Sequence, residues 1–399
     1  MPTILFGAFD RHNLGDLLFP HVLEAMLGKK QELVVAGLAG RDLRPFGGHR
    51  VAALPALTAR WGERSVNLVH AGGEILTCDA WQAAVMLLSR EQAQTVIARH
   101  DKDEAERLAW ARRVLGSDRL AAYMAPKTLF RHPGTFVYNA VGGVDLGARD
   151  PAFRAEVLDT LRAAEYVAVR DHITLDCLAR AGIPARLAPD PAVMVAELFR
   201  ERISRQRDSA EIAKLRERFP QGFAAIQFSA DFGDDATLNT IAAQLDRASR
   251  ATGLAMVFFR AGAAPWHDEM ASYQSVSGRM ALAPFQLFES LNIWDICALI
   301  AESRVYCGSS LHGRILAMSF ALPRLNMLHP AQTGTTKQAA YARTWDLEIM
   351  PKAVQAQGIA QGIEDALGAN TTAMTQTAVR LSALYRQQFG EWSGLLQGK

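Results

Sequence analysis

The 399 residues are enough for two or three domains, at roughly 150 residues per domain. Hydrophobic residues make up 49% and charged residues 21% of the chain, a composition that supports a packed core and excludes disordered, collagen-like and coiled-coil proteins. Lys and Arg total 43 against 41 Asp and Glu, so the net charge of +2 provides no global basic field for a nucleic-acid partner, and any anion site must be local.

The first half of the chain alternates short apolar strands with helices. Its predicted strands are residues 3–8, 33–36, 66–70, 135–140 and 166–169. Helical patterns follow the first of these strands at residue 17, begin after residue 79, cover 151–164 and resume after residue 171, and a charged helical region spans 89–117. This alternation is typical of a parallel sheet with helical crossovers.

A second series of the same kind occupies the rest of the chain. Its predicted strands are 223–228, 254–259, 303–307 and 324–328, and its predicted helices are 236–250, 286–300, 310–321 and 355–367. A last helix over about 371–389 could pack back on the first domain.

The order of elements predicts an α/β protein of two Rossmann-like domains that face each other across a cleft. We expect the N-terminal domain to cover 1–197, a charged connector or surface helix 198–220, the C-terminal domain 221–370, and the last helix 371–399. In open α/β sheets ligands bind at the carboxyl ends of the strands, so the strand-to-helix loops are where site residues should lie.

The chain is expected to be cytoplasmic. Its first residues lack the pattern of a signal peptide, and no segment approaches the roughly 18 apolar residues that span a bilayer. The four cysteines, widely spaced and without a CxxC motif, suggest neither a zinc knuckle nor a disulfide framework.

Two loops of the first domain could contact a ligand. In the first, Asp16 is expected to cap the following helix, whereas Asn13 lies too far ahead for a cap and its amide could donate to a ligand oxygen. In the second, Gly72 and Gly73 let the backbone approach a ligand and expose N–H groups to an anion. The second loop is neither a Walker loop nor a GxGxxG motif, so neither nucleotide triphosphate hydrolysis nor a dinucleotide is predicted.

Arg170 ends a predicted strand, directly before Asp171, the expected cap of the next helix. Its guanidinium can form a forked pair with a carboxylate or phosphate of a ligand. The alternative is an ion pair within the protein, with Asp171 or Asp190.

The loop after the strand 303–307 carries the most informative motif of the second domain. Ser309 or Ser310 can cap the next helix, whose N–H groups and positive dipole end form an anion site. His312 lies in the first turn and is an acid/base candidate, although a lone histidine is more often structural. Gly313 allows the helix to approach a neighbour closely.

Two further cations follow strands of the second domain. Arg260 comes directly after the strand 254–259, and Lys337 follows the last strand. Both could equally be ordinary surface charges.

Taken together, these motifs resemble the polysaccharide pyruvyl transferase family. They are Asn-x-Gly-Asp near the start, the Gly-Gly turn, Val-Arg-Asp with Gly-Ile-Pro and Pro-Asp-Pro behind it, and Ser-x-Leu-His-Gly-x-x-x-Ala-x-x-x-x-x-Pro, which contains Leu311, Ala317 and Pro323. The resemblance spans Asn13 to about Lys337 and implies a fold similar to the GT-B glycosyltransferases.

The resemblance implies transfer of a pyruvyl group from phosphoenolpyruvate to two hydroxyls of a saccharide, forming a ketal and releasing phosphate, in cell-envelope polysaccharide biosynthesis. His312 matches the family's expected catalytic histidine, and Arg170 lies at a strongly patterned arginine. Arg170, Arg314 and the helix start at Ser310 could hold the donor's carboxylate and phosphate. The N-terminal domain would take the acceptor and the C-terminal domain the donor, with no metal or other cofactor. A lipid-linked acceptor would require docking at the inner membrane face, for which no amphipathic basic helix is evident.

Two alternatives remain open at the level of sequence. A nucleotide-sugar glycosyltransferase of GT-B fold would need a carboxylate for the ribose hydroxyls, and Glu289 or Asp295 could serve. A non-catalytic carbohydrate-binding relative would keep the fold alone.

Overall fold

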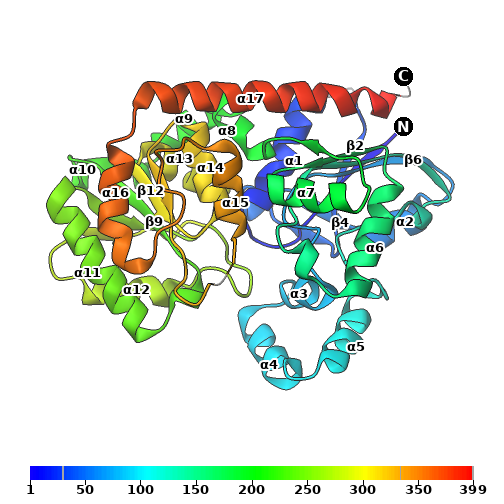
Figure 1. Cartoon of the computed structure of the whole chain (residues 1–399), viewed down its shortest axis with the longest axis horizontal. Helices are drawn as coiled ribbons and strands as arrows, with labels where there is room; N and C mark the ends of the chain where they lie inside the picture. Colours follow the sequence, from blue (N-terminus) through cyan, green and yellow to red (C-terminus); the bar gives the residue numbers. More distant parts are fainter. Residues whose placement is uncertain (29–30, 333, 398–399) are drawn as a thin grey trace. The chain divides into compact units, whose positions relative to one another are not determined.

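The computed structural model describes residues 1–28, 31–332 and 334–397. The chain divides into two compact units (Figure 1). Unit 1 comprises Met1–Pro191 and Leu384–Lys399, and unit 2 comprises Ala192–Ala383.

Unit 1 is built on an eight-stranded sheet with the strand order β3-β4-β2-β1-β5-β6-β7-β8. Its strands are β1 (Thr3–Phe6), β2 (Leu33–Gly37), β3 (Arg41–Asp42), β4 (Arg50–Ala53), β5 (Ser65–His70), β6 (His132–Val141), β7 (Tyr166–Val169) and β8 (Arg186–Leu187). All neighbouring strands pair in parallel except the short β3, which is antiparallel to β4. The carboxyl ends of β1, β5, β6 and β7 therefore lie at one edge of the sheet.

Both faces of this sheet are covered, which explains the continuous apolar runs of its central strands. Ile4 and Phe6 of β1 point into one core, and Leu5 between them is equally buried. The helices of unit 1 before the final one are α1 (Leu14–Leu27), α2 (Leu54–Arg60), α3 (Ala80–Val85), α4 (Arg90–His100), α5 (Glu104–Leu115), α6 (Pro151–Arg162) and α7 (His172–Arg180).

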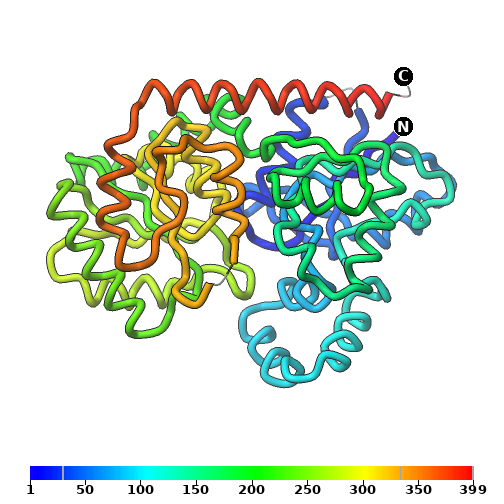
Figure 2. Tube along the Cα trace, viewed as in Figure 1, coloured from blue at the N-terminus to red at the C-terminus, as the bar shows by residue number. Residues whose placement is uncertain are grey.

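The charged region 89–117 forms two helices, α4 and α5, as its composition predicted. Together with α3 they project from the sheet of unit 1 as a small helical lobe (Figure 2). Each helix begins at a side chain that accepts a backbone N–H, which are Asp79, Ser89 and Asp103. The lobe has small cores of its own, in which Trp81 packs edge-on against Trp110.

Unit 2 contains a five-stranded, fully parallel sheet with the order β11-β10-β9-β12-β13. Its strands are β9 (Phe223–Gln227), β10 (Ala255–Phe258), β11 (Phe285–Leu287), β12 (Val305–Gly308) and β13 (Arg324–Asn326). Its helices are α8 (Val195–Leu198), α9 (Arg200–Arg207), α10 (Ala210–Arg218), α11 (Asp235–Thr252), α12 (Met270–Arg279), α13 (Ile293–Glu302), α14 (Leu311–Ser319), α15 (Lys337–Trp345) and α16 (Ile359–Leu367). Ala224 and Ile226 face one core while Ala225 between them is also buried, so this sheet too is covered on both faces.

The structure differs from the expected elements in several places. The predicted helix 286–300 is wrong at its start, because Phe285–Leu287 pairs with β10 as an edge strand and α13 begins at Ile293. The stretch 198–220, expected as a solvated connector or surface helix, forms the helices α9 and α10, and it is less solvated than expected because Ile203, Ile212 and Leu215 are buried. The short strand β4 and the helix α2 were not predicted.

The final helix, α17 (Thr371–Ser393), is longer than predicted, and its residues from Leu384 onward belong to unit 1. Within that unit the Tyr385 hydroxyl accepts a hydrogen bond of 2.9 Å from the Asn139 amide. The Asn67 amide donates to the backbone carbonyl of Leu396 at 3.1 Å. These contacts, not hydrophobic pattern alone, attach the last residues to the first sheet.

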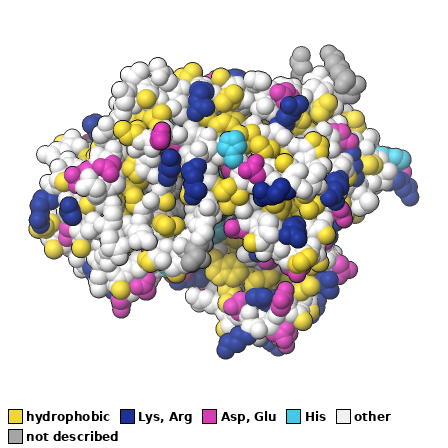
Figure 3. Space-filling model, viewed as in Figure 1, with side chains coloured by type: hydrophobic (Ala, Val, Ile, Leu, Met, Phe, Trp, Pro, Cys, Tyr) yellow, Lys and Arg dark blue, Asp and Glu magenta, His cyan; other side chains and the backbone are white. Residues whose placement is uncertain are grey.

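Among the helices of the described residues, none combines the length and hydropathy needed to cross a bilayer. On the face drawn in Figure 3, Lys and Arg side chains are interspersed with Asp and Glu side chains instead of gathering in one patch. This distribution agrees with the small net charge.

Candidate functional site

The loop between β1 and α1 is held by Asn13, not by Asp16. Asn13 is the N-cap of α1, and its side-chain oxygen accepts the N–H groups of Gly15 at 3.2 Å and Asp16 at 3.4 Å. The expectation that Asp16 caps the helix is therefore wrong, because α1 begins at Leu14, one turn earlier than the apolar pattern indicated. Asp16 instead lies in the first turn, buried beside Arg11.

The Gly-Gly turn after β5 contacts this same loop. Gly72 and Gly73 have φ angles of +131° and +89°, which side chains of L residues rarely allow. A Cβ on Gly73 would stand 3.2 Å from the Asp16 carboxylate oxygen, and one on Gly72 would stand 3.1 Å from the Phe19 ring. The structure thus brings the two predicted loops of unit 1 together at the carboxyl edge of its sheet.

Arg170 is fully engaged with carboxylates of its own unit. Its Nη2 lies 2.6 Å from the Glu74 carboxylate and its Nη1 lies 2.9 Å from Asp190, and its side chain is 2% exposed. Burial alone would lower the pKa of Arg170, but the charges of Glu74 and Asp190 outweigh it and raise the pKa. Of the two readings from sequence, the structure places Arg170 in the internal ion pair with Asp190, and it adds Glu74 as a partner that sequence reasoning missed.

This ion-pair network joins three loops. Glu74 follows the Gly-Gly turn and also accepts the backbone N–H of Val144 at 3.0 Å. Gly142, at the end of β6, packs so tightly there that a Cβ would meet Glu74 at 2.2 Å and Arg170 at 2.7 Å. The buried guanidinium therefore has a positioning role for the Glu74 loop, and the catalytic or donor-contact role expected of Arg170 from sequence stays a prediction.

Arg11 is a site candidate that sequence reasoning missed. Its Nη1 donates to the Tyr123 hydroxyl at 2.6 Å, and that hydroxyl donates to Asp10 at 3.0 Å. Its Nη2 lies 3.9 Å from Asp16, so a largely buried cation adjoins the first loop. The signal was available, since Arg11 lies in a strand-to-helix loop, where site residues were expected.

In unit 2, the segment 309–314 forms the start of α14, directly after β12. Ser310 is the N-cap, and its Oγ accepts the N–H of Gly313 at 3.2 Å. The other candidate cap, Ser309, has its Oγ bonded to the N–H of Ser229 at 3.0 Å. Leu311 and His312 occupy the first turn and are buried, His312 with 9% of its surface exposed.

A buried network links this helix start to the loop that carries Arg260. The side chain of Gln227, at the end of the central strand β9, accepts the N–H of Ser310 at 2.8 Å and donates to Asp268 at 2.7 Å. Asp268 also accepts the N–H of Ala261 at 2.6 Å. Gln227 and Asp268 therefore hold the β10 and β12 loops on either side of β9, although neither was a candidate from sequence.

Burial raises the pKa of Asp268 to about 7, against the opposing effect of the backbone N–H groups and Gln227 that it accepts from. Its two oxygens accept from the Gln227 amide and from the backbone N–H groups of Ala261 and Gly262. A sequence pattern could not have revealed this, because the two partners are 41 residues apart.

The start of α15, which carries Lys337, is hydrogen-bonded to the loop that leads into α14. Lys337 opens α15 and is exposed, and the next residue, Gln338, donates from its side chain to the backbone carbonyl of Ser309. Arg260 thus lies in the loop after β10, His312 in the first turn of α14 and Lys337 at the start of α15. Hydrogen bonds of Gln227, Asp268 and Gln338 join these three segments. Among the described residues, the Nε of Arg260 is buried with no hydrogen-bond partner.

Arg314 lies in the interior of unit 2 and does not join Arg260, His312 and Lys337 as a candidate for contact with a ligand. It bonds Asp346 through Nη2 at 2.6 Å and Nε at 3.0 Å, donates to Asn326 at 3.1 Å, and is completely buried. The prediction that Arg314 holds the donor is wrong, because the helix turns its side chain into the core beside Arg324. Gly313 meets its expected close neighbour, since a Cβ there would stand 2.4 Å from the Tyr306 ring.

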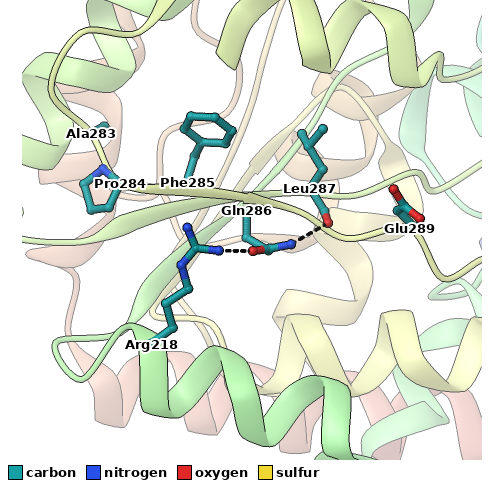
Figure 4. Close-up of a pocket in the computed structure, with 7 residues that line it drawn as sticks. All are labelled: Arg218, Ala283, Pro284, Phe285, Gln286, Leu287 and Glu289. Atoms are coloured by element: carbon teal, nitrogen blue, oxygen red, sulfur yellow. Dashed lines mark hydrogen bonds between the residues drawn. The ribbon is translucent and has the colours of Figure 1, made fainter. Parts of the chain in front are cut away.

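A pocket of about 450 Å³ lies elsewhere in unit 2, along the edge strand β11 (Figure 4). Arg218, at the end of α10, donates to the Gln286 side chain across it. Glu289, the carboxylate considered for a nucleotide-sugar enzyme, lines this pocket. Asp295 is instead bonded by Gln206 and Ser290, so the second carboxylate considered is held by neighbouring side chains.

Solved structures similar to this one define its fold class. UDP-GlcNAc 2-epimerase from Neisseria meningitidis, bound to UDP-GlcNAc, has a TM-score of 0.51 at 11% identity, covering 97% of this chain and 100% of that one. UDP-GlcNAc 2-epimerase from Methanocaldococcus jannaschii has a TM-score of 0.53 at 9% identity, over 96% and 99%. A trehalose-6-phosphate synthase has a TM-score of 0.50 at 11% identity, over 100% and 98%. The chain therefore has the predicted GT-B-like fold of parallel α/β sheets.

The family is indicated by the sequence. Residues 139–327 match the model of the family Polysaccharide pyruvyl transferase, which confirms the resemblance stated from the motifs. The match includes Arg170 and His312 but is narrower than the span of the motifs, because Asn13, Gly72 and Lys337 lie outside it. It supports a transferase of polysaccharide biosynthesis. The comparison with curated proteins found no match.

Proposed function

We propose that this protein transfers the pyruvyl group of phosphoenolpyruvate to two hydroxyls of a saccharide and releases phosphate. The observation that carries the proposal is the placement of His312 in the first turn of α14, inside the region that matches the family. Two cationic residues, Arg260 after β10 and Lys337 at the start of α15, lie on segments that are hydrogen-bonded to Ser309 and Ser310, just ahead of that turn.

The donor's charges suit this edge of unit 2. Phosphoenolpyruvate carries a carboxylate and a phosphate, which are bound by guanidinium and ammonium groups and by helix N-termini. The N-terminus of α14 supplies backbone N–H groups and a positive dipole end. Arg260 has a buried Nε that an anion can accept from, and Lys337 is exposed to solvent.

The reaction needs one group that moves protons. A proton adds to the methylene carbon of the donor, the first sugar hydroxyl loses its proton and its oxygen bonds to the central carbon. The second hydroxyl then loses its proton and its oxygen replaces the phosphate at that carbon, and the phosphate leaves with the ester oxygen and takes up that proton. His312 is the proton-transfer group in this scheme, because a neutral imidazole has one nitrogen that can donate a proton and another that can accept one.

A thermal shift measurement tests donor binding without any acceptor. Phosphoenolpyruvate at 100 times its dissociation constant stabilises a protein by about 2.7 kcal/mol, or about 7 °C for a unit of this size. We expect this rise to be lost in Arg260→Ala and kept in Arg250→Ala, a matched control on the exposed end of α11. A rise with UDP-GlcNAc alone would favour a nucleotide-sugar enzyme instead.

The role of His312 is tested separately. His312→Ala should keep the thermal shift with phosphoenolpyruvate, since the cations remain, but should lose at least a hundredfold in phosphate release with a panel of saccharides. The exposed His132→Ala is the control and should retain full activity. Undiminished phosphate release by His312→Ala contradicts the proposed proton transfer.

A further inference from the structure

Unit 1 holds a cluster of two histidines and a glutamate that the proposed function does not use. His21 and Glu24 lie three residues apart on α1, and His49 lies in the loop just before β4. One ligand atom from each of the three lies within 4.8 Å of the other two. Within the described residues this is the one group of three or more His, Cys, Asp or Glu side chains so closely placed.

The local geometry suits metal coordination. The Nε2 of His49 lies 2.9 Å from the Glu24 carboxylate, and the rings of His21 and His49 have centroids 4.0 Å apart. With metal bonds of 2.0–2.1 Å, ligand atoms around a tetrahedral ion are about 3.3 Å apart. The three side chains therefore need to adjust by up to about 1.5 Å, which rotation of the partly exposed Glu24 and His49 side chains can supply.

One histidine already has the outer contact that metal-binding histidines commonly make. The Nε2 of His21 is 2.8 Å from the backbone carbonyl of Gly47, which can only accept, so Nε2 carries the proton. That hydrogen bond fixes the tautomer in which Nδ1 is unprotonated. It also fixes the orientation of the ring relative to the loop that carries His49.

We propose that His21, Glu24 and His49 bind one divalent transition metal ion of the zinc class. Two imidazoles and one carboxylate match the ligands that Zn²⁺ takes, whereas Mg²⁺ and Ca²⁺ prefer sets made of oxygen atoms alone. All three residues are partly exposed, so water completes the coordination. The ion would join the middle of α1 to the loop before β4, and α1 is the helix that begins at the Asn13 loop.

The test uses the full chain, freed of metal with a chelator and titrated with ZnCl₂ in a calorimeter. We expect one equivalent to bind. His49→Gln and Glu24→Gln should each lower the zinc affinity at least tenfold. Removing a residue that only hydrogen-bonds to a metal ligand already costs about tenfold or more, and loss of a ligand itself should cost no less. MgCl₂ should give no binding.

A matched control comes from the same unit. His100 and Glu106 form a similar pair at 3.2 Å that belongs to no cluster of three among the described residues, so His100→Gln should leave zinc binding unchanged. Circular dichroism without metal confirms that each variant folds, and the more exposed Glu24→Gln decides the outcome if His49→Gln does not. Wild-type protein that binds no Zn²⁺, or Glu24→Gln with wild-type affinity, overturns the proposal. Neither result depends on phosphoenolpyruvate, so the proposed function is tested independently.

Discussion

Replacing Arg170 separates a structural role from a ligand contact. Arg170→Ala would leave Glu74 and Asp190 close together without the cation between them, and Asp190 is completely buried. Removing one partner of a buried ion pair costs about 3–5 kcal/mol, because the remaining charge is left uncompensated. In a unit of about 200 residues, with an unfolding entropy of roughly 2.1 cal/mol/K per residue, this lowers the midpoint of unit 1 by about 7–12 °C.

The assay is urea and thermal unfolding of the purified variants. Arg162→Ala is the matched control, since its pair with Asp159 is exposed and such pairs contribute at most about 1 kcal/mol. Arg170→Lys keeps the charge but not the fork that reaches both carboxylates, so it should fall between the two. A midpoint within 2 °C of wild type for Arg170→Ala, combined with lost phosphoenolpyruvate binding, would refute the positioning role and restore the direct contact.

Two further predictions concern unit 2. Gly313→Ala should lower the free energy of unfolding in urea by about 1–3 kcal/mol, because its Cβ would overlap Tyr306. Gly278→Ala on α12, with open space around it, should be neutral or stabilising. Equal effects of the two substitutions would contradict the packing argument. The folded-state pKa of Asp268, about 7, lies above its ordinary value of 3.8, so the folded state keeps this proton up to a higher pH than the unfolded state does. The free energy of unfolding should therefore fall, by on the order of 4 kcal/mol, as pH rises from 4 to 7. Asp268→Asn should flatten this dependence of the unfolding midpoint, and an unchanged slope would show that other groups cause it.

Much of the fold could be predicted because its signals are local. The apolar runs of β1, β5, β9 and β12 and the alternation with helices define parallel sheets without any knowledge of contacts. The edge strand β11 was missed because Phe285–Leu287 is short, only partly buried and directly ahead of a helical pattern. A pattern of hydrophobicity cannot indicate that such a segment pairs with β10.

For the candidate site, too, the features that depend on neighbouring residues could be predicted from the sequence. The sequence by itself determined that His312 starts a helix after a strand, with a serine cap and a glycine beside it, because caps and turns depend on neighbouring residues. It also determined the resemblance to a family, which depends on the order of motifs.

Only the tertiary structure decided which charged groups are committed to the protein itself. Arg170, Arg260 and Arg314 look alike in sequence, each at the end of a strand or the start of a helix. The structure pairs Arg170 with Glu74 and Asp190, pairs Arg314 with Asp346, and leaves the Nε of Arg260 without a partner among the described residues. The physical reason is that electrostatic pairing depends on distance in space, and residues such as Glu74 and Arg170 are 96 positions apart in the chain.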